Sequence, residues 1–264
     1  HAWLPDAHAE APVPVSALLS GIVINIGAYA LARTVTIFAP HYESVVTFIA
    51  ILASISMVVG IVMALVQDDL KRLLAFSSIS QIAYVIEGLG LGTYLGIYGG
   101  LFHMVNHTIA KTLLFLCAGA LMYAAGSRKI SELGMTAKKM PVTAFCFFVG
   151  ALAIGGLPPF NCFMSKLTIF FALAESGILW AAVIGIATGI ITLACFVWTL
   201  SRIFRQKPTL TPNPQVAGKS VPFLMQISML ILALACIFLG VFPQTLYPML
   251  NAAAESILKI LGAG

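Results

Sequence analysis

The run LFHMVNHTIAKTLLFLCAGAL, residues 101–121, carries three ionisable side chains within an otherwise apolar segment. It belongs to a longer stretch from Tyr94 to Tyr123, and a helix needs about 20 apolar residues to cross a bilayer. The whole chain has this character, with 60% hydrophobic and 9% charged residues, whereas a soluble domain carries about 25% charged residues. Because so few charges cannot cover a water-facing surface, the sequence predicts an all-α integral membrane protein.

About eight transmembrane helices are expected, with a connecting loop over 1–12 and a second loop over 208–220. The eight apolar stretches span residues 13–38, 45–66, 73–91, 94–123, 141–157, 160–174, 178–204 and 221–242. After the last of them, residues 246–261 form an amphipathic tail that we expect to lie on the membrane surface.

A proline-rich interruption, GGLPPFN at residues 155–161, separates two of these stretches. Proline cannot donate a backbone hydrogen bond and disfavours helix at the residue before it, so this run predicts a break. A break at membrane depth survives where protein or a water-filled cavity satisfies the backbone, and broken helices often mark ion sites. A plain interhelical turn is the alternative.

The ionisable residues of the fourth stretch, His103, His107 and Lys111, follow one another at intervals of four. This spacing places all three on one face of a helix. Since an ionisable group at the bilayer centre costs at least about 2.5–3.5 kcal/mol, three on one face indicate a function. Histidine titrates near neutral pH, so such a file can pass protons. The alternative is that the three side chains only bond neighbouring helices.

Four further polar side chains lie within apolar stretches. Lys166 follows the break by a few residues, too deep for easy escape to the interface, and we expect it to carry protons. Ser77 and Gln81 lie one turn apart and can hold water or bond another helix. Glu87 near the end of its span reaches the interface or pairs with a buried lysine or histidine.

Other kinds of site receive little support. The opening segment contains His1, Asp6, His8 and Glu10, but nothing fixes them in ligand geometry, so we interpret it as a hydrogen-bonded loop without a metal. The five cysteines contain no CxxC pair and are interpreted as buried small hydrophobes rather than as ligands of a cofactor. The net charge of +5 is spread through short loops, which argues against nucleic-acid binding.

Membrane orientation stays undecided when eight spans simply alternate, because the basic residues of the loops divide six to five. One group contains Lys71, Arg72, Arg128, Lys129, Lys138 and Lys139, and the other contains Arg33, Arg202, Arg205, Lys207 and Lys219.

Four segments together resemble the antiporter-like subunits of respiratory complex I, energy-converting membrane hydrogenases and Mrp-type cation/proton antiporters. These segments are HAWLPDAHAEAPVPVSALLSGI (1–22), DDLKRLLAFSSISQIAYV (68–85), LFHMVNHTIAKTLLFLCAGAL (101–121) and GALAIGGLPPFNCFMSK (150–166). The family fold has fourteen helices with two inverted repeats of five. The resemblance implies that residues 13–66 close the first repeat and 67–207 form the second, with its broken helix near 155–166. It also implies a partial chain, from about the seventh helix onward, ending in a final helix and tail over 221–264.

The resemblance implies roles for individual residues. Lys111 corresponds to the central lysine of the second repeat, linked to His107 and His103, and Lys166 to the terminal charged residue of the broken helix. One position departs from the family: the pattern L-x-G-x-x-x-K is here LSGIVIN, which places Asn25 where a lysine is usual. Glu87 stands where an apolar residue is expected. Asparagine cannot carry a proton as a charge, so the first repeat has lost its usual relay.

The leading hypothesis is therefore a proton-translocating subunit of a redox-driven pump. We expect it in an energy-transducing membrane, namely the prokaryotic cytoplasmic membrane. The chain shows no redox centre of its own, so the resemblance implies partner membrane subunits and a peripheral arm with iron–sulfur centres. The alternatives are a subunit of a Mrp-type sodium/proton antiporter and a structural spacer that has lost transport.

Overall fold

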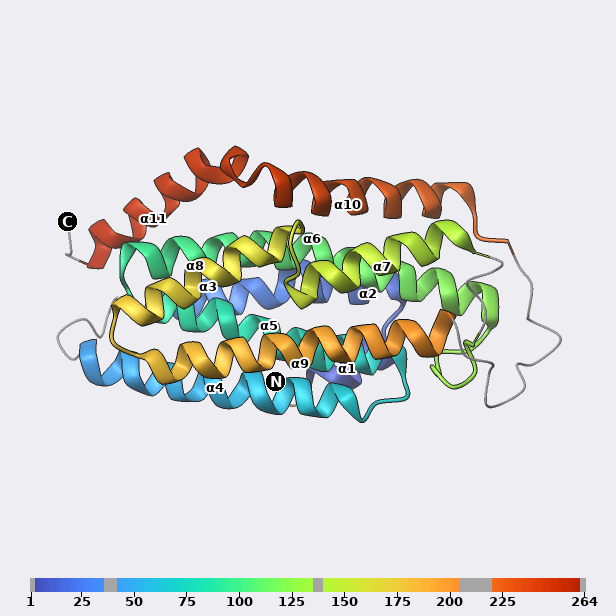
Figure 1. Cartoon of the computed structure of the whole chain (residues 1–264), viewed down its shortest axis with the longest axis horizontal. Coiled ribbons are helices and arrows are strands. Elements are labelled where there is room, and N and C mark those ends of the chain that lie inside the picture. Colours follow the sequence, from blue (N-terminus) through green and yellow to red (C-terminus); the bar gives the residue numbers. More distant parts are fainter. Residues whose placement is uncertain (1–2, 36–41, 135–139, 205–219, 262–264) are drawn as a thin grey trace.

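The computed structural model describes residues 3–35, 42–134, 140–204 and 220–261 and consists of helices lying along one long axis (Figure 1). The helices are α1 (Leu4–Glu10), α2 (Val13–Leu18), α3 (Ile24–Val35), α4 (Tyr42–Leu65), α5 (Leu70–Gly90), α6 (Tyr94–Ala125), α7 (Pro141–Gly155), α8 (Asn161–Glu175), α9 (Leu179–Phe204), α10 (Phe223–Val241) and α11 (Tyr247–Leu261). A π-helical turn, Leu19–Val23, joins α2 to α3, and a short 3₁₀ turn, Pro243–Leu246, joins α10 to α11.

Within these ranges, six helical segments are long and apolar enough to cross a membrane, which confirms the predicted membrane architecture. The segments at 141–157 and 160–174, counted above as two spans, differ from the rest. They form α7 and α8, fifteen residues each, which lie end to end along the bundle (Figure 1). The two short helices therefore form the two parts of one broken helix, because the proline run stops α7 at Gly155.

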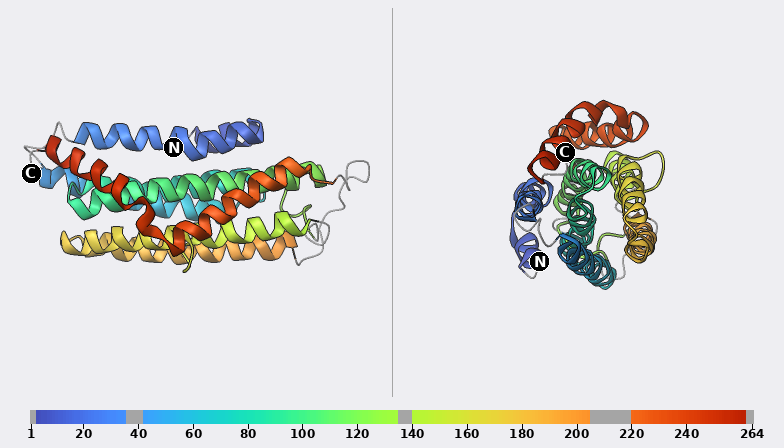
Figure 2. Two further views of the ribbon diagram at one scale, coloured as in Figure 1. Left: turned by 90° about the horizontal axis from the view of Figure 1, so that it is seen from above. Right: turned by 90° about the vertical axis from the view of Figure 1, so that its left-hand side faces the viewer.

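The centre of the bundle is the antiparallel pair α5 and α6, surrounded by α3, α4, α7, α8 and α10 (Figure 2). Of the apolar windows of these spans, 89% is buried in α5 and 67% in α6, against 22% in α10. Polar side chains on the facing sides of α5 and α6 are thus hidden from lipid.

Glycines bring α5 and α6 into backbone contact near their shared turn. A Cβ built on Gly88 would lie 2.9 Å from the carbonyl oxygen of Gly96 and 3.0 Å from the Cα of Gly100. No side chain fits between the two backbones at this level, so the space between α5 and α6 is closed there.

The two ends of the described chain are helical, which differs from expectation at the N-terminal end alone. Residues 4–10, predicted as loop, form helix α1, because Pro5 occupies a first-turn position where proline is tolerated. His1 lies outside the described residues. The amphipathic tail is helical as expected. It packs along α6, with Leu250, Ala254 and Ile257 buried, because this apolar stripe fits against the bundle.

Among the described residues, Lys71, Arg72, Arg128, Lys129 and Arg202 lie at one end of the bundle and Arg33 ends α3 at the other, contrary to the side that alternating eight spans gave Arg202. The remaining residues of that count, Lys138, Lys139, Arg205, Lys207 and Lys219, lie outside the described residues. Arg202 binds Asp68 at 2.8 Å and Arg128 binds Asp69 at 2.7 Å, so the last turn of α9 lies beside the start of α5. Counting the broken helix as two crossings had placed Arg202 at the wrong end. At this same end the Ser127 hydroxyl donates to Glu132 and lowers the pKa of its carboxyl.

Candidate functional site: a polar axis between α5, α6 and α8

Lys111 lies at the meeting point of three helices and has no exposed surface. Its Nζ donates to the carbonyl oxygen of Leu74 at 2.9 Å and to the hydroxyl of Ser77, both on α5. The same nitrogen lies 5.7 Å from the centre of the Phe196 ring on α9. Two acceptors serve an ammonium group that has three donors. Lys111 is therefore held by polar atoms of α5, with no carboxylate among its contacts.

The two histidines continue from Lys111 along α6, as their spacing predicted. The rings of His103 and His107 are 6.4 Å apart between centroids, and both residues are fully buried. His103 Nδ1 bonds the Ser165 hydroxyl of α8 at 2.9 Å, while its Nε2 and both ring nitrogens of His107 have no partner among the described residues. Buried polar atoms normally have a protein or water partner, so this part of the interior is suited to water.

The break between α7 and α8 is organised around Lys166. Gly156 ends α7 with φ of 77°, a left-handed conformation that glycine adopts without strain. The end of α7 carries free carbonyl groups and the negative end of the helix dipole. Lys166 Nζ folds back and donates to one of them, Ile154 O, at 2.9 Å. With 4% of its surface exposed, Lys166 stays inside the bundle, as predicted from its depth.

A pair of asparagines fastens the broken helix to α6. The side-chain amide of Asn106 donates to the backbone oxygen of Asn161 at 3.0 Å, and that of Asn161 donates to the backbone oxygen of Asn106 at 3.2 Å. Both residues are fully buried. Because Asn106 lies between the two histidines on α6, this clasp sets the distance between the break and the histidine file.

Tyr84 of α5 lies between His103 and Lys166 and was not identified from the sequence. Its ring stands edge-on to His103, with centroids 5.7 Å apart, and Lys166 Nζ lies 4.9 Å above its face. Its hydroxyl donates to the Gly185 carbonyl and bonds Thr188, both on α9. The sequence feature that could have identified Tyr84 is its position, one turn after Gln81 on the polar stripe of α5.

Helix α1 brings a further histidine toward Lys111. His8 is fully buried, its ring stacks on Phe115 at 4.9 Å, and neither ring nitrogen has a partner among the described residues. Lys71, which the sequence assigned to a loop, is 3% exposed and donates to the carbonyl oxygens of Ala9 and Ala11 at the end of α1. Two buried lysines, Lys71 and Lys166, thus hold the carboxyl ends of two short helices.

The acidic residues of the opening segment serve as ion-pair partners in the structure. Asp6 binds Arg72 at 2.6 Å, and Glu10 lies 3.4 Å from Arg128. These contacts explain how α1 is held over α5.

Asn25, at the position where the family pattern has lysine, bonds only uncharged groups in the structure. Its side-chain nitrogen donates to Gly21 O at 2.7 Å and to Thr108 Oγ1 at 2.8 Å, and Thr108 in turn donates to Gly21 O. The π-helical turn just before Asn25 exposes this carbonyl group to both donors. Asn25 therefore ties α3 to α6 by uncharged hydrogen bonds.

The accessory residues of α5 divide into two groups. Ser77 accepts a hydrogen bond from Lys111, whereas neither side-chain atom of the buried Gln81 finds a partner within the described ranges. Glu87 pairs with no lysine or histidine in the part of the chain that the structure describes, contrary to one of the two expectations. It is 1% exposed and accepts a hydrogen bond from Ser54 of α4 at 3.3 Å.

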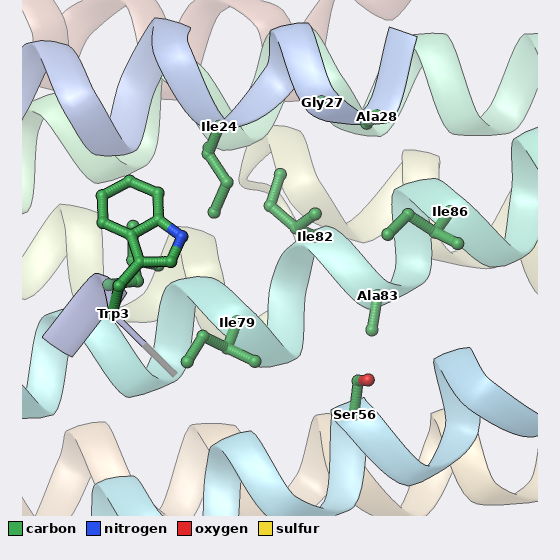
Figure 3. Close-up of a pocket in the computed structure, with 10 residues that line it drawn as sticks. Trp3, Ile24, Gly27, Ala28, Ser56, Ile79, Ile82, Ala83 and Ile86 are labelled. Atoms are coloured by element: carbon green, nitrogen blue, oxygen red, sulfur yellow. The ribbon is translucent and has the colours of Figure 1, made fainter. Parts of the chain in front are cut away.

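Two cavities lie within the bundle, one beside the polar axis and one away from it. A cavity of about 180 Å³ between α8 and α9 is lined by Lys166 and by Gly156 at the break. A larger one of about 270 Å³ lies between α1, α3, α4 and α5 (Figure 3). Its lining, which includes Trp3, Ile24, Ile79 and Ile82, contains no titratable side chain, so this second cavity lies outside the polar axis. All five cysteines are free and buried, as expected.

The fold and the axis together define a class of membrane protein in which buried lysines and histidines lie beside a broken helix. The family model described as "NADH:quinone oxidoreductase/Mrp antiporter, TM" matches residues 1–192. The chain therefore belongs to this family of antiporter-like membrane subunits.

Individual relatives and structures agree with this assignment. Formate hydrogenlyase subunit 3 of Escherichia coli is 35% identical, over 98% of this chain and 46% of that protein. An antiporter subunit of Staphylococcus aureus is 37% identical, over 76% of this chain and 40% of that protein. A chain of the membrane-bound sulfane sulfur reductase, an archaeal respiratory membrane complex, superposes with a TM-score of 0.90 at 30% identity, covering 100% of this chain and 53% of that one. The chain thus spans less than half the length of these two curated relatives.

Proposed function

We propose that this chain is part of a proton-translocating subunit of a redox-driven membrane complex, in which protons pass along Lys111, His107, His103 and Lys166. The observation that carries the proposal is the continuity of this file. Lys111 is held by Ser77, the histidine rings are 6.4 Å apart, and His103 reaches the broken helix through Ser165.

The proposed mechanism uses a change in the proton affinity of Lys111. An ammonium group buried without a carboxylate is costly, so a modest change in neighbouring charge decides whether Lys111 holds its proton. When Lys111 releases the proton, the unpaired ring nitrogens of His107 can accept it through water, and His103 can pass it to the region of Lys166. Lys166 receives charge beside the carbonyl end of α7, which favours a cation.

The complex around the chain is proposed from its relatives. The match to the formate hydrogenlyase subunit extends over 98% of the chain, which favours a redox partner arm with iron–sulfur centres. We place the chain among other membrane subunits in an energy-transducing membrane, the prokaryotic cytoplasmic membrane in particular. Electron transfer would take place in those partners.

Purification tests the nature of the complex. We expect a tagged full-length subunit to copurify with iron–sulfur or hydrogenase subunits, and proteoliposomes of that complex to move protons in the absence of sodium. Copurification with small hydrophobic subunits alone, together with strict sodium dependence, contradicts the proposal.

A Mrp-type sodium/proton antiporter is the second candidate. It is favoured by the 37% identity to the staphylococcal antiporter subunit. The same subunit of other Staphylococcus aureus strains matches 96% of the chain at 33% identity, slightly below the 35% identity over 98% of the chain for the formate hydrogenlyase subunit, so we rank the antiporter second.

We propose a membrane orientation from the charge distribution. Lys71, Arg72, Arg128, Lys129 and Arg202 lie at the Asp68 end of the bundle, so the positive-inside rule places this end in the cytoplasm. A Lys129→Cys variant should react with an impermeant maleimide only in inverted vesicles. The matched variant is Glu175→Cys, at the last residue of α8 and at the end of the bundle opposite Asp68. It should react only in right-side-out vesicles. The reverse pattern contradicts this orientation.

A further inference from the structure

Glu87 is a buried carboxyl group that the lysine–histidine file does not include. It lies in α5 and is 1% exposed, and its Oε1 accepts one hydrogen bond, from Ser54 of α4 at 3.3 Å. Its Oε2 has no partner in the part of the chain that the structure describes. An ionised carboxylate held by a single hydroxyl would be costly in this interior, whereas a protonated carboxyl needs only one further acceptor.

Glu87 continues the polar stripe of α5 beyond the file. Along this stripe Ser77 bonds Lys111, and Tyr84 contacts His103 and lies under Lys166. Glu87 follows Tyr84 by three residues, close to one helical turn. Because α5 and α6 are antiparallel, the direction from Ser77 to Glu87 on α5 is the same as the direction from Lys111 to His103 on α6. Both lead toward the turn between α5 and α6.

The glycine contact between α5 and α6 closes the direct continuation of the axis at this level. Gly88 meets the backbone of Gly96 and Gly100, which leaves no space between the two helices. Glu87 precedes Gly88 and points to the other side, toward α4, as its bond to Ser54 shows. A proton moving past Tyr84 therefore meets a carboxyl on the α4 side, and meets packed backbone on the α6 side.

From this arrangement we infer that Glu87, held by Ser54, is a proton-exchange site that connects the Tyr84–Lys166–His103 group with the end of the bundle opposite Asp68. The inference rests on the proposed function and adds a terminal group to the same path. In each cycle the carboxyl releases one proton toward the α5–α6 turn and takes one from the Tyr84 side. No electrons move in this step.

The test compares Glu87→Gln and Glu87→Asp with wild type in the purified complex reconstituted in liposomes. Electron transfer and proton uptake are measured together. A side chain positioned for proton transfer typically raises the rate of that transfer about 10²–10⁴-fold. Glu87→Gln is therefore expected to lower proton uptake per electron about 100-fold. Glu87→Asp keeps a carboxyl group and should retain much of the uptake. Glu175→Gln, an exposed carboxyl at the end of α8, is the matched control and should leave uptake unchanged.

A second readout does not depend on transport. In an infrared difference spectrum of wild type minus Glu87→Gln, we expect the carbonyl band of a protonated carboxyl. A carboxylate band in its place overturns the inference, as does normal uptake by Glu87→Gln. If added sodium restores proton uptake by Glu87→Gln, the position is a cation site, and this result overturns the inference as well.

The Lys111→Met variant separates this inference from the proposed function. Loss of uptake in Lys111→Met with normal uptake in Glu87→Gln refutes the role of Glu87 alone. Normal uptake in Lys111→Met refutes the proposed function.

Discussion

The broken helix depends on a glycine in a neighbouring helix, and replacing that glycine gives a sharp prediction. Gly240 of α10 lies directly on the backbone of the break. A Cβ at this position would lie 2.6 Å from the carbonyl carbon of Phe160 and 2.7 Å from its Cα, with a still closer approach to the carbonyl oxygen of Pro159. Real Cβ atoms stay beyond 3.0 Å from such neighbours, so Gly240→Ala forces the two backbones apart by about 0.4 Å at the carbonyl carbon of Phe160 and by more at the carbonyl oxygen of Pro159.

The size of the effect follows from what the break positions. Forcing extra volume into a packed interior costs about 1–3 kcal/mol, which should lower the midpoint of thermal unfolding. The shift at Phe160 is transmitted to Asn161, which holds the break against Asn106. A misplacement of about 1 Å can lower the rate of a catalysed step on the order of 100-fold. We therefore expect Gly240→Ala to lower the rate of proton pumping roughly tenfold.

The assay is proton uptake by liposomes that contain equal amounts of assembled complex. Gly27→Ala is the matched control, because a Cβ at Gly27 meets nothing within 4 Å in this chain. If Gly240→Ala pumps and unfolds like Gly27→Ala, the described packing of α10 on the break is refuted.

Two further substitutions test single contacts of the axis. Asn161→Leu leaves the partner groups of Asn106 unpaired, which should destabilise the complex by about 1–3 kcal/mol and lower its unfolding midpoint; an unchanged midpoint contradicts the clasp. Asn25→Leu removes uncharged hydrogen bonds worth about 1 kcal/mol, so stability should fall slightly. Its pumping per assembled complex should stay near wild type, and a loss as deep as that of a Lys111 variant would show that Asn25 belongs to the path.

Helical periodicity made part of the site predictable. His103, His107 and Lys111 repeat every four residues, so a helix had to place them on one face. The proline run likewise predicted the break beside Lys166. The partners of these side chains come from other helices, and no spacing within one segment reports them. Ser165, Asn106 and Tyr84 were missed for that reason.

The errors have physical causes as well. Residues 4–10 looked like a loop because they are polar and flanked by prolines, yet proline in a first turn is compatible with a helix. Arg202 was placed at the wrong end because each half of the broken helix was counted as a full crossing. The ion pair between Arg202 and Asp68 shows that α7 and α8 together make one passage along the bundle.

The most direct test of the proposed proton path is a Lys111→Met variant, assayed for proton uptake and electron transfer in the same reconstituted complex. Methionine keeps the length of the side chain and cannot bind a proton. The path described here predicts that the complex still assembles and that proton pumping is abolished or sharply lowered. Pumping at the wild-type level would contradict it.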